Sequence, residues 1–280
     1  MIDDAEHLGE GDAPFRAALV PGVASALSPL VRRIMVPDPE APGGVATATY
    51  LVGIDEVAVV DPGPPERSDH VESIVGASMR ERVRWVLATE PRPELFGAAV
   101  RLAEETGALV LGPPGTAGRA LADGQVVEGS EFGVQAIAAP GPSPHHVCYL
   151  VEEERALICG SLLGGPGAAV TDVAALRESI ARIQKRRMRL TRLLPLHGHL
   201  VDQPTLALEA RLNELEATDA ALLERLAAGP ARVEELAEVI ATERVSGPDE
   251  AARLVLAHLQ ALRTAGRVAG RDARSVWKPA

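Results

Sequence analysis

Glu90, Arg92 and Glu94, spaced two residues apart, are the residues of this sequence best placed to do chemistry. They follow an apolar run at 83–87, which predicts a buried strand, and precede residues 97–100, which predict the start of a helix. A polar segment at the carboxyl end of a buried strand is where α/β proteins place many of their sites. Two carboxylates there can act as general acid and base, although Glu94 can equally serve as the acidic residue at the helix start.

The composition is that of a globular protein with a sizeable core, since 46% of its 280 residues are apolar and 24% are charged. Its net charge of −11 disfavours broad binding of nucleic acids. The acidic N-terminus lacks the features of a signal peptide, and no apolar run is long enough to span a membrane, so we expect a cytoplasmic protein. Cys148 and Cys159 lie in apolar runs and are expected to be buried free thiols.

The elements that position the candidate site alternate between strand and helix, and then become strands separated by turns. The predicted strands of the first part are 31–36, 48–53, 56–61, 82–88 and 108–112, and its helices are 69–78 and 96–106. The second part contains short strands at 125–127 and 134–139, a hairpin of 147–151 with 156–160, a helix at 172–187 and a strand at 193–196.

The last part of the chain is mostly helical. Amphipathic helices are predicted at 206–228, 233–242 and 249–265, followed by a short hairpin of 267–269 with 275–277. This succession is typical of a winged-helix module. We therefore predict a flexible acidic tail (1–14), a main domain (15–203) and a winged-helix-like C-terminal domain (204–280).

Five fragments, in this order, resemble the metallo-β-lactamase superfamily, in particular the β-lactamase-like hydrolases with a C-terminal winged-helix extension. They are 49–53, 59–63, 139–147 (with its Pro-Gly, Ser-Pro and His-Val pairs), 157–160 and 194–198. The resemblance implies an α+β fold, an αββα sandwich of two mixed β-sheets flanked by helices. It also implies that the C-terminal extension completes the substrate cleft or forms the face of a homo-oligomer, rather than reading DNA.

The resemblance also implies a metal centre, usually of zinc, which lowers the pKa of a bound water to about 7 and so supplies a hydroxide. At the positions of the family's ligands this sequence has Glu90, Arg92, Glu94, Leu95, Pro142, Ser161 and His197. Of these, only His197 is the residue that the family uses, and Leu95 has no atom that binds metal. We therefore expect that the metal centre is lost, and we predict no cofactor.

Arg92 suggests how the pocket could work without the ion. Asp61, Glu90 and Glu94 would face one another, and close carboxylates disfavour each other's ionised form. Our hypothesis is that the Arg92 guanidinium replaces the charge of the metal by pairing with these acids. The alternative is that Arg92 points into solvent.

Other residues of the former cleft carry weaker signals. Ser143 and Ser161 could form a nucleophile only with His197 as their base. His145, His146 and His199 are interpreted as structural or surface histidines rather than as a displaced metal site.

Two functional hypotheses follow, and a third is disfavoured by charge. The first is a non-catalytic or catalytically altered member of the fold that binds a small molecule or a protein in the former active-site cleft. The alternative is a hydrolase of an ester, thioester or phosphodiester, with a relocated zinc site built from Glu90, Glu94, His197 and another histidine. The third is binding of nucleic acid by the winged-helix module.

Overall fold

The computed structural model describes residues 20–37, 46–165, 170–186, 189–240 and 247–280. The predicted acidic tail (1–14) lies outside these residues, as do the last residue of the predicted helix 172–187 and the last two of the predicted helix 233–242. In the described ranges, none of the helices has the length and apolar character needed to cross a lipid bilayer.

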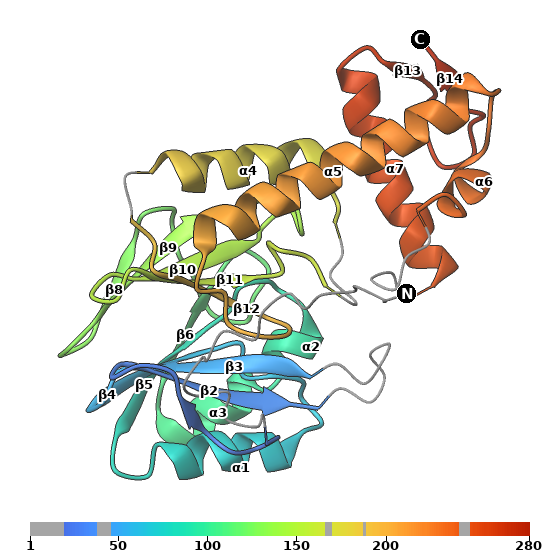
Figure 1. Ribbon diagram of the computed structural model, residues 1–280. Helices are drawn as coiled ribbons and strands as arrows, with labels where there is room; N and C mark the ends of the chain where they lie inside the picture. The colour runs from blue at the N-terminus through green and yellow to red at the C-terminus, as the bar shows by residue number, and fades with distance from the viewer. Residues whose placement is uncertain (1–19, 38–45, 166–169, 187–188, 241–246) are drawn as a thin grey trace, which may run out of the picture.

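The first sheet has seven strands in the order β1-β2-β3-β4-β5-β6-β7 (Figure 1). They are β1 (Ser25–Ala26), β2 (Val31–Val36), β3 (Thr47–Val52), β4 (Glu56–Val60), β5 (Arg82–Leu87), β6 (Leu109–Gly112) and β7 (Arg119–Ala120). Pairing is antiparallel from β1 to β4 and parallel from β4 to β7. Because β4 and β5 are parallel, their carboxyl ends meet at one edge of the sheet, where Asp61 and Glu90 follow.

The second sheet has five strands in the order β12-β11-β10-β9-β8. They are β8 (Val126–Glu128), β9 (Gly133–Ala138), β10 (Val147–Val151), β11 (Ala156–Gly160) and β12 (Arg192–Pro195). β10 and β11 form the predicted antiparallel hairpin, and β12 adds in parallel to β11. An isolated antiparallel bridge joins Thr47, at the start of β3 in the first sheet, to His197, just after β12 of the second sheet.

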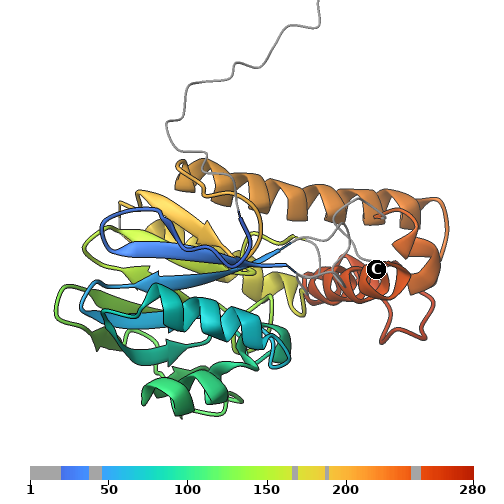
Figure 2. The same cartoon turned by 90° about the horizontal axis from the view of Figure 1, so that it is seen from below.

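The sheets are stacked, with helices on both outer sides (Figures 1 and 2). Along β3 the side chains alternate, so that Tyr50 packs in the core between the sheets while Leu51 packs against the helices outside. The flanking helices are α1 (Ser68–Ala77), α2 (Pro93–Phe96), α3 (Ala99–Thr106) and α4 (Val173–Lys185). The predicted αββα sandwich of two mixed sheets is therefore confirmed.

The C-terminal part contains α5 (Pro204–Ala227), α6 (Val233–Ala237), α7 (Pro248–Thr264) and a ribbon of β13 (Val268–Ala269) with β14 (Lys278–Pro279). Leu222 and Leu226 of α5 join a separate core there, around the fully buried Trp277. Leu208 and Leu215 of the same helix instead pack on the second sheet of the sandwich. Because α5 contributes residues to both cores, it connects the two parts. The winged-helix interpretation stays a prediction.

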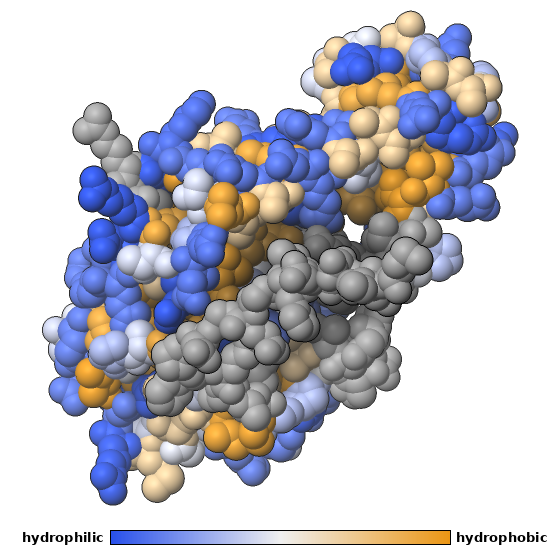
Figure 3. Space-filling view, in the orientation of Figure 1, coloured by the Kyte–Doolittle hydropathy of each residue, from blue (hydrophilic) through white to orange (hydrophobic). Residues whose placement is uncertain are grey.

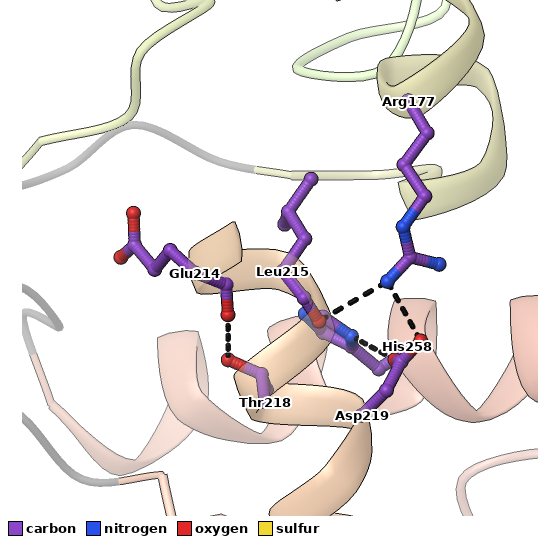
Figure 4. Close-up of polar contacts among 6 residues, drawn as sticks. All are labelled: Arg177, Glu214, Leu215, Thr218, Asp219 and His258. Atoms are coloured by element: carbon purple, nitrogen blue, oxygen red, sulfur yellow. Dashed lines mark hydrogen bonds and ion pairs between the residues drawn. The ribbon is translucent and has the colours of Figure 1, made fainter. Parts of the chain in front are cut away.

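A half-buried polar cluster also joins the two parts, as Figure 4 shows. Arg177 of α4 donates from Nη2 to the Asp219 carboxylate of α5 at 2.6 Å and to the Leu215 carbonyl at 3.1 Å. His258 of α7, which is 1% exposed, lies with its Nδ1 2.6 Å from the other Asp219 oxygen. One carboxylate thus holds three helices, and we call these three side chains the Asp219 cluster.

Candidate functional site

Asp61 is held in an unusual conformation directly after β4. It is 3% exposed and has φ of 54°, a left-handed conformation that residues other than glycine seldom adopt. Its carboxylate accepts hydrogen bonds from the backbone N–H of Thr89 at 2.8 Å and from the Thr89 hydroxyl at 2.7 Å. The two parallel strands therefore place Asp61 beside the stretch that begins at Thr89.

The environment of Asp61 favours its protonated form. Burial raises the pKa of this carboxyl from 3.8 to about 7, even though the two hydrogen bonds from Thr89 lower it. The charge of Glu90 raises it further, and the charge of Arg92 lowers it. Asp61 therefore gains or loses a proton near neutral pH, and its pKa depends on the charges of Glu90 and Arg92.

Buried hydrogen bonds from Thr49 and His70 hold the backbone of Asp61 in place. The Thr49 hydroxyl donates its single proton to the Asp61 carbonyl at 2.6 Å, and it lies 2.8 Å from Nε2 of His70. Nε2 of His70 must then be the donor of that second bond. Burial lowers the pKa of His70 to about 4, so its ring is neutral at neutral pH.

Glu90 and His146 are deeply buried beside Asp61 and Thr89, each with an exposed fraction of 1%. Nδ1 of His146 is 3.1 Å from the Ala139 carbonyl, which can only accept, so Nδ1 carries a proton. Burial lowers the pKa of His146, although the Glu90 charge acts to raise it. A neutral His146 with Nδ1 protonated presents a lone pair on Nε2.

Several buried polar atoms in and around this group lack a hydrogen-bond partner among the described residues. They are both carboxylate oxygens of Glu90, Nε2 of His146, Nη1 of Arg92, and the hydroxyls of Ser143 and Ser161. Folded proteins rarely leave buried polar atoms unpaired, so these atoms are candidates for contact with a bound water, ion or ligand. Gly160 allows the His146 ring to pack close to the backbone, because a Cβ there would lie 2.7 Å from Nε2 of His146.

Arg92 and Glu94 lie at the start of α2 and are more exposed than Asp61, Glu90 and His146. The two charges form an ion pair of 3.7 Å between Nε and Oε2, which is longer than a hydrogen bond. The Glu94 side chain is 62% exposed and that of Arg92 is 28% exposed. Glu94 therefore belongs to the rim, while Arg92 is half-buried and acts on Asp61 through its charge.

Ser143, Ser161 and His197 do not form a nucleophile pair. Neither serine hydroxyl has a hydrogen-bond partner in the described part of the chain, so neither is bonded to His197. His197 is half-buried in the bridge with Thr47, whereas His145 and His199 are exposed.

The donor set does not fit the metal centre that the family resemblance implies. Leu95 is apolar and buried, Pro142 offers no donor atom, and Arg92 brings a positive charge to a cation site. Within the described ranges, no three or more His, Cys, Asp or Glu side chains lie together in a way that could hold a metal ion. The relocated set of Glu90, Glu94 and His197 with a further histidine is not assembled there.

Thr49, His70 and the inward-facing His146 were missed as site residues by the sequence analysis. Thr49 and His70 are single polar residues in amphipathic or apolar segments, and the hydrogen bond between them joins β3 to α1 across 21 residues. For His146, the available sequence signal was the family-like pairs Pro140-Gly141 and His146-Val147. These pairs do not indicate the direction in which the imidazole ring points.

No protein-family model matches the sequence. Among curated proteins, the atrochrysone carboxyl ACP thioesterase of Aspergillus fumigatus is 28% identical over 186 residues, which cover 63% of this chain and 58% of that protein. The lactamase-like protein ptaB of Pestalotiopsis fici is 25% identical over 209 residues, which cover 71% of this chain and 66% of that protein. The match thus spans about three fifths to two thirds of the length of these relatives.

Solved structures resemble the chain over almost its whole length. A beta-lactamase domain protein from Burkholderia ambifaria superimposes with a TM-score of 0.81 at 19% identity, covering 94% of this chain and 96% of the other. A metallo-beta-lactamase family protein from Thermus thermophilus gives a TM-score of 0.74 at 20% identity, covering 91% and 100%. These likenesses extend through the C-terminal helices as well as the sandwich.

Replacing Arg92 with methionine should raise the pKa of Asp61 further above about 7, because the Arg92 charge favours the carboxylate. The pKa can be followed by NMR titration of the side-chain carboxyl carbons. Arg101→Met, which removes an exposed ion pair with Glu105 on α3, is the matched control and should leave Asp61 unchanged. An equal pKa in wild type and Arg92→Met would refute charge replacement by Arg92.

Proposed function

Because this chain has the metallo-β-lactamase fold, we propose that it binds an acyl thioester in the former active-site cleft through protein side chains alone. The observation that carries this proposal is Glu90. Its carboxylate is buried, and both of its oxygens lack a hydrogen-bond partner among the described residues. An unpaired buried carboxylate is costly, so a ligand that donates hydrogen bonds to it is bound favourably.

The other groups of the pocket complement an acyl thioester. Nη1 of Arg92 can donate to the thioester carbonyl. The carrier arm of such a ligand contains amide N–H groups, which the Glu90 oxygens can accept. The class of ligand is suggested by the relatives, since several are named as ACP thioesterases.

Binding can be measured by isothermal titration calorimetry with a ketone analogue of acetyl-pantetheine, in which a methylene replaces the sulfur. Glu90→Gln should weaken binding by roughly 10- to 100-fold, because a hydrogen bond to a charged group contributes about 1.5–3 kcal/mol. Glu94→Gln is the matched control at the exposed rim and should change the affinity by less than about twofold. Equal affinities of wild type and Glu90→Gln would contradict the proposal.

A second candidate is hydrolysis of the thioester, which is favoured by the names of the relatives and by the pKa of Asp61. In this reaction the Nε2 lone pair of His146 would take a proton from water as the water attacks the carbonyl carbon. Asp61, which is partly protonated near pH 7, would supply a proton to the leaving thiolate. Release of free thiol from acetyl-pantetheine, lost in His146→Gln, would establish this activity.

A further inference from the structure

We infer that a basic surface around the C-terminal ribbon of β13 and β14 docks an acidic segment of a partner protein. Six exposed cationic side chains form this surface, which we call the ribbon surface: Arg232, Arg263, Arg267, Arg271, Arg274 and Lys278. The ribbon lies at the end of the C-terminal part that is away from the sandwich (Figure 1). This docking does not depend on the ligand proposed for the cleft, so either proposal can fail without the other.

The charge of this segment is opposite to that of the whole chain. Residues 263–280 contain five basic side chains and one acidic side chain, in a chain whose net charge is −11. Within the described ranges, none of these five basic side chains forms an ion pair. The acidic residue, Asp272, is engaged within its own loop, because its carboxylate accepts from the Ser275 hydroxyl and from the Arg274 backbone N–H, both at 3.0 Å. The ribbon surface thus carries positive charge that an acidic partner can neutralise.

Contacts with the loop between β13 and β14 bring the cations together. Nη1 of Arg263, from α7, donates to the Arg271 carbonyl at 3.0 Å. Nη1 of Arg232, just before α6, donates to the Arg274 carbonyl at 3.2 Å. The loop itself is held by Trp277, whose fully buried ring donates from Nε1 to a carbonyl of the loop at 3.1 Å. Because these bonds order the loop in the free chain, a partner binds without the entropy cost of ordering it.

An exposed apolar residue favours a protein partner over nucleic acid. Val276 lies on the same loop as Arg271 and Arg274 and is 51% exposed. Figure 3 shows apolar and strongly hydrophilic residues side by side at this end of the molecule. An apolar contact within a polar rim is typical of protein interfaces, whereas nucleic acids are held mainly through their phosphates. The segment at α6 also adds exposed acids that repel a long polyanion: Glu234, Glu235 and Glu238. A short acidic segment with an apolar residue therefore fits the ribbon surface best.

The test is fluorescence anisotropy of the intact chain with a labelled peptide of repeated Glu-Glu-Leu units, at about 0.1 M salt, where charges more than about 10 Å apart are largely screened. We expect saturable binding that weakens as salt is added. Arg271→Glu combined with Arg274→Glu should weaken it at least about tenfold, because two attractive contacts become repulsive. Arg80→Glu combined with Arg119→Glu makes the same change of net charge at exposed positions of the sandwich. This control should change the affinity by less than about twofold.

Two further variants probe the same surface. Val276→Ser should weaken binding of the peptide by about threefold or more, because it removes the apolar contact. Arg267→Glu combined with Lys278→Glu should match the loop variant, and it keeps the test decisive if the loop variant does not fold.

The ribbon surface would be overturned if the peptide does not bind, if a Gln-Gln-Leu peptide binds equally well, or if the ribbon and control variants lose affinity equally. Labelled duplex DNA that binds more tightly than the peptide, and is released by the same ribbon substitutions, would overturn an acidic protein partner in favour of nucleic acid.

Discussion

Asp61 should lower the free energy of unfolding by about 4 kcal/mol as the pH rises from about 4 to about 8, and Asp61→Asn should abolish this decrease. The pKa of this buried carboxyl is raised from 3.8 to about 7, and each unit corresponds to about 1.4 kcal/mol. Between these values the folded state holds a proton that the unfolded chain has released. The free energy of unfolding therefore falls as the pH rises through this window.

His70 contributes in the opposite direction, so the comparison must be made between variants. Its pKa is lowered from 6.5 to about 4, so the unfolded chain binds the extra proton and stability rises with pH over that range. Urea unfolding of wild type, Asp61→Asn and His70→Gln between pH 4 and pH 8 separates the two. Asp61→Asn should gain stability relative to wild type with rising pH, and His70→Gln should gain it with falling pH. Parallel curves for Asp61→Asn and wild type would rule out the raised pKa.

Asp219→Ala should lower the free energy of unfolding by about 1.5–3 kcal/mol, because it leaves the half-buried Arg177 guanidinium and the buried His258 ring without their shared charged acceptor. Although burial acts to raise the pKa of Asp219, its bonds to His258 and Arg177 outweigh that effect and lower the pKa. The carboxylate is therefore the form that the cluster stabilises, and its contribution is lost as the pH falls through that lowered value.

Asp202→Ala is the matched control for this change, since Asp202 pairs with Arg192 but is 69% exposed. An exposed ion pair contributes about 0–1 kcal/mol. Urea unfolding at pH 7 should therefore distinguish the two variants clearly. A loss in Asp219→Ala no larger than that in Asp202→Ala would show that the cluster does not join the helices.

The sandwich was predictable because its strands show alternating or continuous apolar residues between turn residues, as in 31–36 and 156–160. Strands β1 and β7 were missed, since two residues carry no periodicity. The helix predicted at 96–106 is interrupted, because the Ala98 N–H bonds the Gly63 carbonyl at 3.0 Å instead of continuing the helix. That partner lies 35 residues away in sequence, and local pattern does not reveal it.

The same distinction holds for the C-terminal part and for the site. Trp277 was expected in a strand of the terminal hairpin, but its backbone pairs with Ala231, and β14 follows it at Lys278–Pro279. In the cleft, the spacing of Glu90, Arg92 and Glu94 and the strand end at Asp61 identified groups that interact. The burial of Glu90, the exposure of Glu94 and the contribution of His146 depend on packing between distant segments, so the sequence alone did not separate them.

The cleft should bind an acyl thioester through side chains and without a metal ion. The most direct test is calorimetry with the acetyl-pantetheine ketone analogue on protein treated with chelator, and on the same protein supplied with one and two equivalents of zinc. We predict dissociation constants that agree within about twofold under the three conditions and that rise about 10- to 100-fold in Glu90→Gln. Binding that occurs only with zinc, and is lost in His197→Ala, would contradict metal-free recognition of the thioester.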